Sequence, residues 1–257
     1  MYSLEVHMVD HCNLNCKGCS HFCPIVKDRT HFADIKEIAR DIIRLNAIGC
    51  IPKLFKILGG EPLLHPQITE SLEIFRGLLP HSKIVLWTNG LLLPTIPDIF
   101  FQRCEDFDIQ IVVTPYGPVK NNEKIKEVVD KHWFIVYDFY FNGEFWASPL
   151  GSWDNPGNST TNFETCRLKQ GHCLILEHGK IFQCPTAAFA YRLNEYFGTN
   201  YEVSENDYVD IYNVWDERWF FINIYKPTPF CRYCTKECGQ NFEWGVSRRD
   251  YHEWIKE

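Results

Sequence analysis

Three cysteines near the start of the chain have the type and spacing of metal-cluster ligands. Cys12, Cys16 and Cys19 are separated by three and then two residues, and they follow a short apolar stretch. Three thiolates can hold three irons of a [4Fe–4S] cubane and leave the fourth iron open to a bound ligand. A structural zinc site is the alternative, and Cys23 or His21 would then supply the fourth ligand that such sites require.

Cysteines gather again in the last third of the chain. Of the 12 cysteines in the sequence, Cys50 and Cys104 stand alone, and isolated cysteines usually pack as small apolar side chains. Cys231 and Cys234 form a C-x2-C pair, which is typical of a metal site. In a reducing compartment, clustered cysteines bind metal or do chemistry more often than they form disulfides. A zinc ribbon and an iron–sulfur cluster both fit this second group.

The first group resembles the signature of the radical S-adenosylmethionine (SAM) superfamily, in which C-x3-C-x2-C follows the first barrel strand. The resemblance implies a [4Fe–4S] cluster on Cys12, Cys16 and Cys19, with SAM chelating the open iron. It also implies that an electron from the cluster cleaves SAM to methionine and a 5′-deoxyadenosyl radical, which removes a hydrogen atom from a C–H bond. An external electron donor such as flavodoxin or ferredoxin is the expected partner. The protein itself would supply position and exclusion of water.

A glycine-rich turn strengthens the resemblance. The sequence 59–62 (Gly-Gly-Glu-Pro) ends a predicted strand, where the family carries a similar turn that receives the amino group of SAM. Glycine lets the backbone approach a ligand closely, and Glu61 could accept a hydrogen bond from the ammonium. Residues 88–90 (Thr-Asn-Gly) resemble another family turn beside SAM, and Thr114 occupies the place of a ribose contact. The predicted SAM-binding residues are Gly59, Gly60, Glu61, Pro62, Asn89 and Thr114.

One position departs from the family pattern. The residue before the third cysteine is often aromatic in the family and helps to position the adenine, whereas this sequence has Gly18. Phe22 is the predicted substitute for that surface. Asp10 and His11 precede residues 12–19, which we call the cysteine loop, and could face the site. The ten histidines form no tight metal-ligand pattern, and four of them are interpreted as rim or surface groups: His7, His11, His31 and His65.

The second cysteine group resembles the SPASM and shorter twitch extensions of the same superfamily. Six cysteines suffice for one auxiliary [4Fe–4S] cluster but not for the two of a full SPASM region, which favours the twitch form. The resemblance implies four ligands, with Cys173 or Cys238 as substitutes: Cys166, Cys184, Cys231 and Cys234. A cysteine outside the clusters could instead return a hydrogen atom to a substrate radical, and the candidates are Cys173, Cys238 and Cys23.

Strands and helices alternate over the first two-thirds of the sequence. The apolar pattern predicts strands at 4–9, 53–58, 83–88, 108–114 and 133–139, and helices at 34–48, 67–79, 97–103 and 121–131. This order predicts right-handed crossovers and a parallel sheet, whose carboxyl ends gather functional groups at one rim. The expected fold is α/β, a partial (β/α)6 TIM-like barrel, with the cysteine loop and the SAM-binding turns at that rim.

The remaining sequence changes character. Residues 141–165 are rich in Gly, Pro, Asn and Ser without a steady period, which indicates a long loop or linker. A hairpin is predicted at 173–184, and helices are predicted near 186–197 and 214–225. The predicted domain limits are a radical SAM partial barrel at 1–140, the loop at 141–165 and a small α+β twitch/SPASM-like domain at 166–257.

Charge and the ends of the chain restrict the partners and the location. The net charge is −7, and no Lys/Arg run marks a patch for nucleic acid or membrane. The first residues lack the basic flank and apolar stretch of a signal peptide, and no stretch approaches the roughly 18 apolar residues of a spanning helix. The expected location is cytoplasmic, and neither nucleic acid nor membrane is expected as a partner.

The leading functional prediction is a radical SAM oxidoreductase or epimerase that abstracts a C–H hydrogen from a small polar substrate. Superfamily members with twitch extensions include aminocyclitol dehydrogenases, so the resemblance favours a carbohydrate or aminocyclitol. The first alternative is a maturase of a ribosomal peptide that forms thioethers or cross-links, or epimerises residues. No N-terminal leader-binding domain is expected, because the first strand begins by residue 4. The second alternative is a non-catalytic iron–sulfur electron-transfer or zinc-binding protein, which has no need of a SAM-binding turn at 59–62.

Overall fold

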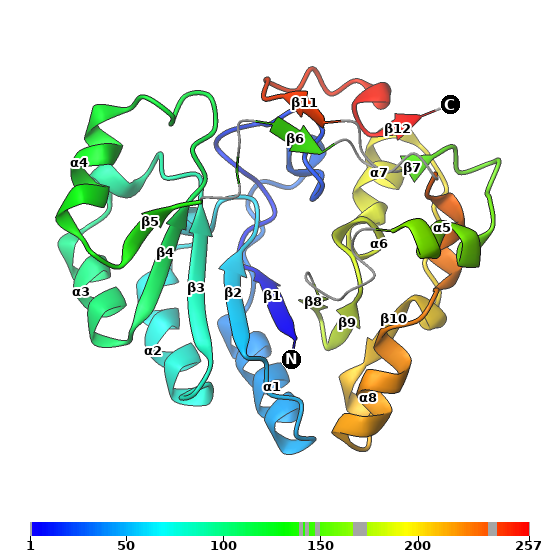
Figure 1. Cartoon of the computed structure of the whole chain (residues 1–257), viewed down its shortest axis with the longest axis horizontal. Helices are drawn as coiled ribbons and strands as arrows, with labels where there is room; N and C mark the ends of the chain where they lie inside the picture. The colour runs from blue at the N-terminus through cyan, green and yellow to red at the C-terminus, as the bar shows by residue number, and fades with distance from the viewer. Residues whose placement is uncertain are drawn as a thin grey trace.

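The computed structural model describes residues 2–138, 141, 144–146, 150–166, 174–235 and 241–256. Within these residues, the largest sheet has eight strands in the order β10-β9-β8-β1-β2-β3-β4-β5, and helices α1 to α4 lie along its outer side (Figure 1). The strands are β1 (Ser3–His7), β2 (Leu54–Leu58), β3 (Lys83–Thr88), β4 (Ile109–Val113), β5 (Ile135–Tyr137), β8 (Leu174–Glu177), β9 (Lys180–Phe182) and β10 (Tyr208–Asp210). The helices are α1 (Ile35–Ala47), α2 (Ile68–Leu78), α3 (Asp98–Asp106) and α4 (Glu123–Lys131).

The alternation of side chains along each strand decides which face meets the helices. Leu4 and Val6 of β1 are fully buried in the main core, where Ile42 of α1 is only 1% exposed. Each such aliphatic side chain stabilises the fold by about 1.5–3 kcal/mol relative to an exposed one. Because successive strand residues point to opposite faces, Glu5 and His7 lie on the inner face of the sheet, away from the helices. Apolar burial therefore leaves polar side chains inside the sheet's curve.

The predicted partial barrel is confirmed. Strands β1 to β5 pair in parallel, and the described part of the sheet stays open because β10 and β5 form its two edges. The helix predicted at 34–48 begins as expected, since the Asp34 side chain accepts a hydrogen bond from the Lys36 backbone N–H at 2.9 Å. Local periodicity thus locates the elements of this half to within a few residues.

The predicted hairpin at 173–184 is present as β8 and β9, and it joins the barrel sheet. Strand β8 runs parallel to β1, with Leu4 opposite Leu174 and Val6 opposite Leu176. The C-terminal part of the chain therefore extends the sheet on the side opposite β5. The domain limits remain a prediction, but the two predicted domains share one sheet.

A second core covers the inner face of β8 and β9. Helices α6 (Pro185–Ala188) and α7 (Ala190–Phe197) correspond to the predicted helix at 186–197, and α8 (Glu217–Ile224) corresponds to the one at 214–225. Phe189 and Leu193 are fully buried there against Ile175 and Phe182.

The region predicted as a loop contains short elements, namely β6 (Glu144–Trp146), β7 (Leu150–Gly151) and α5 (Ser159–Thr165). Among the described helices, none is both long and apolar enough to cross a membrane.

Candidate active site

A cavity of ≈ 180 Å³ lies at the carboxyl ends of β2, β3 and β4, beneath the cysteine loop. The strand ends bring to it the turns that the sequence singled out. Seven of the predicted site residues line it: Cys12, Cys16, Cys19, Gly59, Gly60, Asn89 and Thr114. Cys23, a predicted hydrogen-atom donor, lines it as well.

Gly60 fixes the position of the cysteine loop. Its backbone N–H donates to the Val9 carbonyl at 2.6 Å, and the N–H of Glu61 donates to the His11 carbonyl at 3.1 Å. A Cβ atom on Gly60 would lie 1.9 Å from the His11 oxygen and 2.9 Å from the Cys12 nitrogen. Only glycine permits this approach of two backbones. The Gly-Gly turn therefore holds the first cysteine at the rim of the cavity.

The carboxylate of Glu61 is held by hydrogen bonds within the fold. Its carboxylate is fully buried and does not line the cavity. It accepts hydrogen bonds from the Thr88 hydroxyl at 2.6 Å, the Asn89 backbone at 2.9 Å and the Leu63 backbone at 3.1 Å. Burial raises the pKa of Glu61 to about 7. Glu61 thus ties the end of β2 to the end of β3, and the predicted contacts of Glu61 and Pro62 with SAM stay predictions.

The three signature thiols differ in their electrostatic surroundings. Burial, and secondarily the Glu61 carboxylate, raises the pKa of Cys12 to about 12, and burial also raises the pKa of Cys16. The Cys23 thiol donates to Cys19 and lowers the pKa of Cys19 to about 6. Metal ligation requires thiolates, so cluster binding would release protons from Cys12 and Cys16.

Hydrogen-bond donors point at the sulfurs of the signature cysteines. The Leu14 backbone N–H lies 3.4 Å from the Cys12 sulfur, and the Asn89 side-chain nitrogen lies 3.6 Å from it. The Trp244 indole N–H donates to the Cys16 sulfur at 3.2 Å. Donors of this kind stabilise thiolate charge. Together with three thiols on one cavity, they fit a [4Fe–4S] cluster that leaves one iron for an outside ligand.

The last described segment, residues 241–256, covers the cysteine loop, and the sequence did not predict this. Strand β11 (Asn241–Glu243) pairs with β6, and β12 (Ile255–Lys256) pairs with β7, above the cysteine loop in Figure 1. The Lys17 backbone N–H donates to the Gly245 carbonyl at 2.8 Å, and the Trp254 indole donates to the Cys19 carbonyl at 2.9 Å. This C-terminal cover shields the loop from solvent on that side.

The aromatic residues of the cavity were also missed. Phe22 is fully buried in the second core against Trp254 and does not line the cavity, so the prediction that it replaces the aromatic residue beside the adenine is wrong. The aromatic walls are instead Trp87, Tyr116 and Phe145. The alternation along β3 could have identified Trp87, since it places that side chain on the inner face beside Lys56, whose ammonium lies 5.2 Å from the ring.

Three of the four predicted auxiliary ligands lie near one another. Burial raises the pKa of Cys184 to about 12, with Cys231 and Cys166 adding to the effect. Cys234 follows one turn after Cys231, and its backbone N–H donates to the Cys231 carbonyl at 3.2 Å. The Asn162 side chain of α5 donates to the carbonyls of both Cys231 and Cys234. The structure therefore brings the predicted set into one region.

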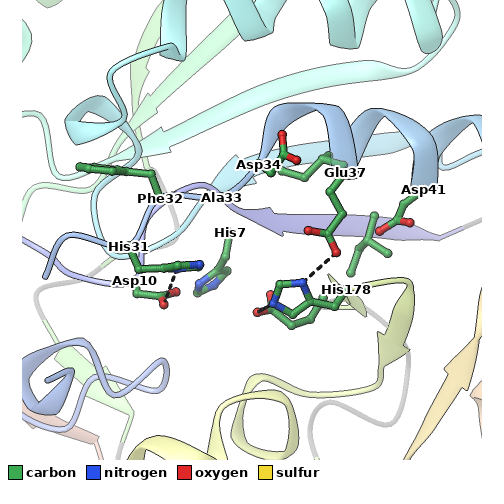
Figure 2. A pocket seen from close by; sticks show the side chains of 12 residues that line it. His7, Asp10, His31, Phe32, Ala33, Asp34, Glu37, Asp41 and His178 are labelled. Carbon is green, nitrogen blue, oxygen red and sulfur yellow. Dashed lines mark hydrogen bonds and ion pairs between the residues drawn. The ribbon is translucent and has the colours of Figure 1, made fainter. Parts of the chain in front are cut away.

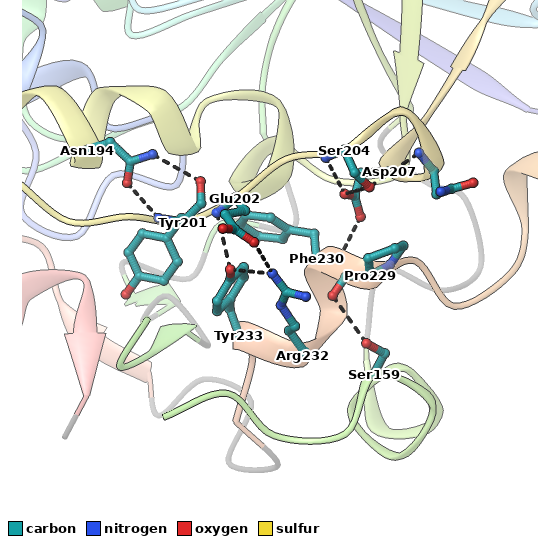
Figure 3. Close-up of polar contacts among 11 residues, drawn as sticks. Ser159, Asn194, Tyr201, Glu202, Ser204, Asp207, Pro229, Phe230, Arg232 and Tyr233 are labelled. Carbon is teal, nitrogen blue, oxygen red and sulfur yellow. Dashed lines mark hydrogen bonds and ion pairs between the residues drawn. The ribbon is translucent and has the colours of Figure 1, made fainter. Parts of the chain in front are cut away.

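The turn that carries the C-x2-C pair is anchored on several sides (Figure 3). The Phe230 backbone N–H donates to Asp207 at 2.5 Å, and the Ser159 hydroxyl donates to the Pro229 carbonyl at 3.2 Å. The Arg232 guanidinium donates to Glu202 at 2.8 Å, which fixes the other side. A turn held in this way can present sulfur ligands with little rearrangement.

Some predictions about metal ligands go untested. Cys173 and Cys238 lie outside the described residues, so neither the substitute ligand role nor the hydrogen-donor role is located. In the part of the chain that is described, no three His, Cys, Asp or Glu side chains are grouped closely enough to hold a single metal ion. A cubane does not require such a group, because each cysteine binds a different iron.

Comparison with known proteins finds a family model that matches the first half of the chain and curated relatives that match part of it. A family model described as a 4Fe-4S single cluster domain matches residues 4–128. The GTP 3′,8-cyclase of Microcystis aeruginosa is 29% identical over 103 residues, which are 38% of this chain and 30% of that protein. The GTP 3′,8-cyclase of Geobacter sulfurreducens is 37% identical over 95 residues, or 35% of this chain and 28% of that protein. The match thus spans less than a third of these curated relatives.

Two solved structures share the fold over most of the chain. BtrN in complex with AdoMet and 2-DOIA superimposes with a TM-score of 0.52 at 14% identity, covering 99% of this chain and 98% of BtrN. Native anSMEcpe with bound AdoMet has a TM-score of 0.52 at 13% identity, covering 91% of this chain and 83% of the other. At this identity the likeness is one of fold, and it extends through the C-terminal part.

Proposed function

We propose that this chain is a member of the radical SAM superfamily, that it takes a [4Fe–4S] cluster and SAM as cofactors, and that it abstracts a hydrogen atom from a C–H bond of a small polar substrate. The observation that carries the proposal is the single cavity that Cys12, Cys16 and Cys19 share with the 59–60 turn. When bound, the cluster and SAM supply one-electron chemistry that produces a 5′-deoxyadenosyl radical.

The residues around the cavity have distinct parts in this proposal. The backbone of Gly59 and Gly60 offers a close approach to the amino acid end of SAM. Thr114 and Asn89 offer polar contacts, and Trp87 offers an aromatic wall for the adenine in place of Phe22. The C-terminal cover excludes water, which a reactive radical requires.

We further propose one auxiliary [4Fe–4S] cluster on Cys166, Cys184, Cys231 and Cys234. Its support is that Cys231 and Cys166 add to the raised pKa of Cys184, that Cys166 adds to the raised pKa of Cys231, and that an anchored turn carries the last two cysteines. Such a cluster could accept the electron that remains after hydrogen abstraction, which fits dehydrogenation. We also propose a reducing, cytoplasmic location, in which clustered cysteines bind metal more often than they form disulfides.

For the substrate we propose a carbohydrate or aminocyclitol. The inner face of the sheet is polar beneath the SAM cavity, where Lys56 and Glu5 form an ion pair of 2.8 Å with side chains 15% and 5% exposed. Polar groups on an inner face suit a ligand rich in hydroxyl or amino groups. The fold likeness to BtrN, whose structure contains 2-DOIA, points the same way.

The test is anaerobic reconstitution followed by iron analysis and a SAM cleavage assay under reduction. We expect about eight irons per chain, about four for each cluster, and formation of 5′-deoxyadenosine and methionine. The triple variant Cys12→Ala, Cys16→Ala, Cys19→Ala should keep about four irons and lose cleavage, whereas Cys104→Ala should behave as wild type. Iron that stays at about four in wild type and falls to none in the triple variant would reject the auxiliary cluster. Absence of cleavage by the fully loaded protein would reject the enzyme. Turnover of a peptide in place of sugars would favour the maturase.

A further inference from the structure

A second cavity, of ≈ 120 Å³, opens between the end of β1, the start of α1 and the β8–β9 turn (Figure 2). We call it the His7 cavity. It joins a wider groove of ≈ 470 Å³, with which it shares four lining residues: Asp10, His31, Glu177 and His178. Asp10 lies two residues before Cys12, so the His7 cavity is a close neighbour of the cysteine loop.

His7 is buried without a polar partner. The residue is 5% exposed, and neither ring nitrogen has a hydrogen-bond partner in the described structure. The rings of Phe189 and His21 hold the imidazole at centroid distances of 4.3 and 4.5 Å. Figure 2 shows the ring directed into the space between His31 and His178. Buried polar atoms are nearly always paired in folded proteins, so this side chain points to a ligand that would pair with it.

The charge of the His7 cavity is negative. Five carboxylates line it, and none of its described lining residues is Lys or Arg: Asp10, Asp34, Glu37, Asp41 and Glu177. Several are already engaged, since Arg192 binds Asp10 at 2.5 Å and His178 lies 2.8 Å from Glu37 and 3.6 Å from Glu177. Burial raises the pKa of Glu177 to about 7, so this group is only partly ionised at neutral pH. The other four carboxylates still outnumber the one guanidinium and the two imidazoles. The excess of negative charge would stabilise a bound cation.

The uncharged imidazole of His7 can form hydrogen bonds with a hydroxyl group of a ligand. Burial lowers the pKa of His7 well below its ordinary value, so the ring is uncharged at neutral pH. An uncharged imidazole has one N–H donor and one nitrogen acceptor. A hydroxyl group can bind both kinds of partner, whereas an apolar ligand would leave them unsatisfied.

We propose that the His7 cavity binds the amino end of a small, amine-bearing polyhydroxylated substrate, with Glu37 and Glu177 facing the ammonium and His7 bonded to a neighbouring hydroxyl. The wider groove takes the rest of the molecule. This inference rests on the proposed function and narrows its substrate class to molecules that carry an amine. His7 is then a specificity residue inside the barrel, and Glu37 is the selector for the amine.

Direct binding tests the proposal without turnover. Calorimetric titration of the reconstituted protein would compare an aminocyclitol with the cyclitol of the same ring in which a hydroxyl replaces the amine. We expect the aminocyclitol to bind about tenfold more tightly. Glu37→Gln should reduce this preference to about twofold or less, mainly by weakening the aminocyclitol. The variant should fold, because the Glu37 side chain is 34% exposed and its replacement does not open the core. His7→Phe should weaken both ligands about tenfold.

Glu73→Gln, an exposed carboxylate on α2, is the matched control and should bind as wild type. Equal affinity for the two ligands, or an undiminished preference in Glu37→Gln, would overturn the proposal. Thermal melting identifies a His7→Phe variant that fails to fold, and the Glu37→Gln comparison then decides alone. Binding is measured separately from SAM cleavage, so the two proposals can fail independently. If the protein cleaves SAM but binds both ligands equally, only this inference is rejected. If it prefers the aminocyclitol but does not cleave SAM, only the proposed enzymatic function is rejected.

Discussion

Trp244 donates its indole N–H to the Cys16 sulfur at 3.2 Å, although 228 residues separate the two in the sequence. The contact depends on Gly117, since a Cβ atom there would lie 2.3 Å from the Trp244 ring. The hydrogen bond between Lys17 and Gly245 fixes the neighbouring backbone. The C-terminal cover thus reaches a predicted cluster ligand directly.

Trp244→Phe should make the SAM-binding cluster harder to reduce. Removing the N–H donor withdraws stabilisation from the more negative, reduced cluster, so its midpoint potential should fall. We expect up to about a tenfold loss in the reduction equilibrium, which for one electron is about 59 mV. A redox titration followed by electron paramagnetic resonance measures it, with exposed Trp215→Phe as the control. An unchanged potential at full iron content would show that Trp244 only packs.

Gly60→Ala should disable the cysteine loop. The new methyl group would overlap the His11 carbonyl at 1.9 Å, and backbone cannot move aside as a flexible side chain can. Overpacking of this kind costs about 1–3 kcal/mol or more. We expect a lower melting temperature and loss of about four irons. Gly77→Ala is the control, because nothing lies within 4 Å of its Cβ position and alanine favours helix α2. Normal iron loading in Gly60→Ala would contradict the role of the turn.

A feature could be predicted from the sequence when a single short segment determines it. The barrel elements follow from periodicity within single segments, so helix α1 and strand β3 were located from the sequence. The 59–60 turn was predicted because two consecutive glycines at the end of a strand are a signal contained in one short segment of sequence. The hydrogen bonds of Glu61 could not be predicted, because they come from Thr88 and Asn89 at the end of the next strand.

Contacts between distant segments escaped the sequence altogether. Nothing in residues 241–256 shows that they pair with β6 and β7, and Trp244 carries no motif. Phe22 was placed at the adenine for its residue type, but its burial against Trp254 is set by the second core. His7 was interpreted as a rim group, and its lack of a partner is visible only when the packing of Phe189 is known.

Asn162→Ala should selectively weaken the proposed auxiliary cluster. The Asn162 amide is buried and donates to the carbonyls of Cys231 and Cys234, so its loss leaves both acceptors unsatisfied. We expect a cost of about 1–3 kcal/mol. When Asn162→Ala is added to the triple variant that lacks the Cys12, Cys16 and Cys19 thiols, the iron bound after reconstitution should fall from about four per chain toward none. Asn223→Ala on α8, which loses a bond within its own helix, should retain the iron. Retention in both variants would show that other contacts hold the turn.

The contact between His178 and Glu37 should make stability depend on pH. The hydrogen bond to Glu37 raises the pKa of His178 above its ordinary value, with the Glu177 carboxylate adding to it. A raised folded-state pKa means that the stabilisation is full below about pH 6.5 and is lost as pH rises through the folded-state pKa. Both side chains are partly exposed, so we expect about 0.5 kcal/mol. Glu37→Gln should therefore lower the free energy of unfolding in urea at about pH 5.5 and leave it nearly unchanged at about pH 8.5. Glu73→Gln should show no such difference, and a deficit in Glu37→Gln that grows with pH would contradict the assignment.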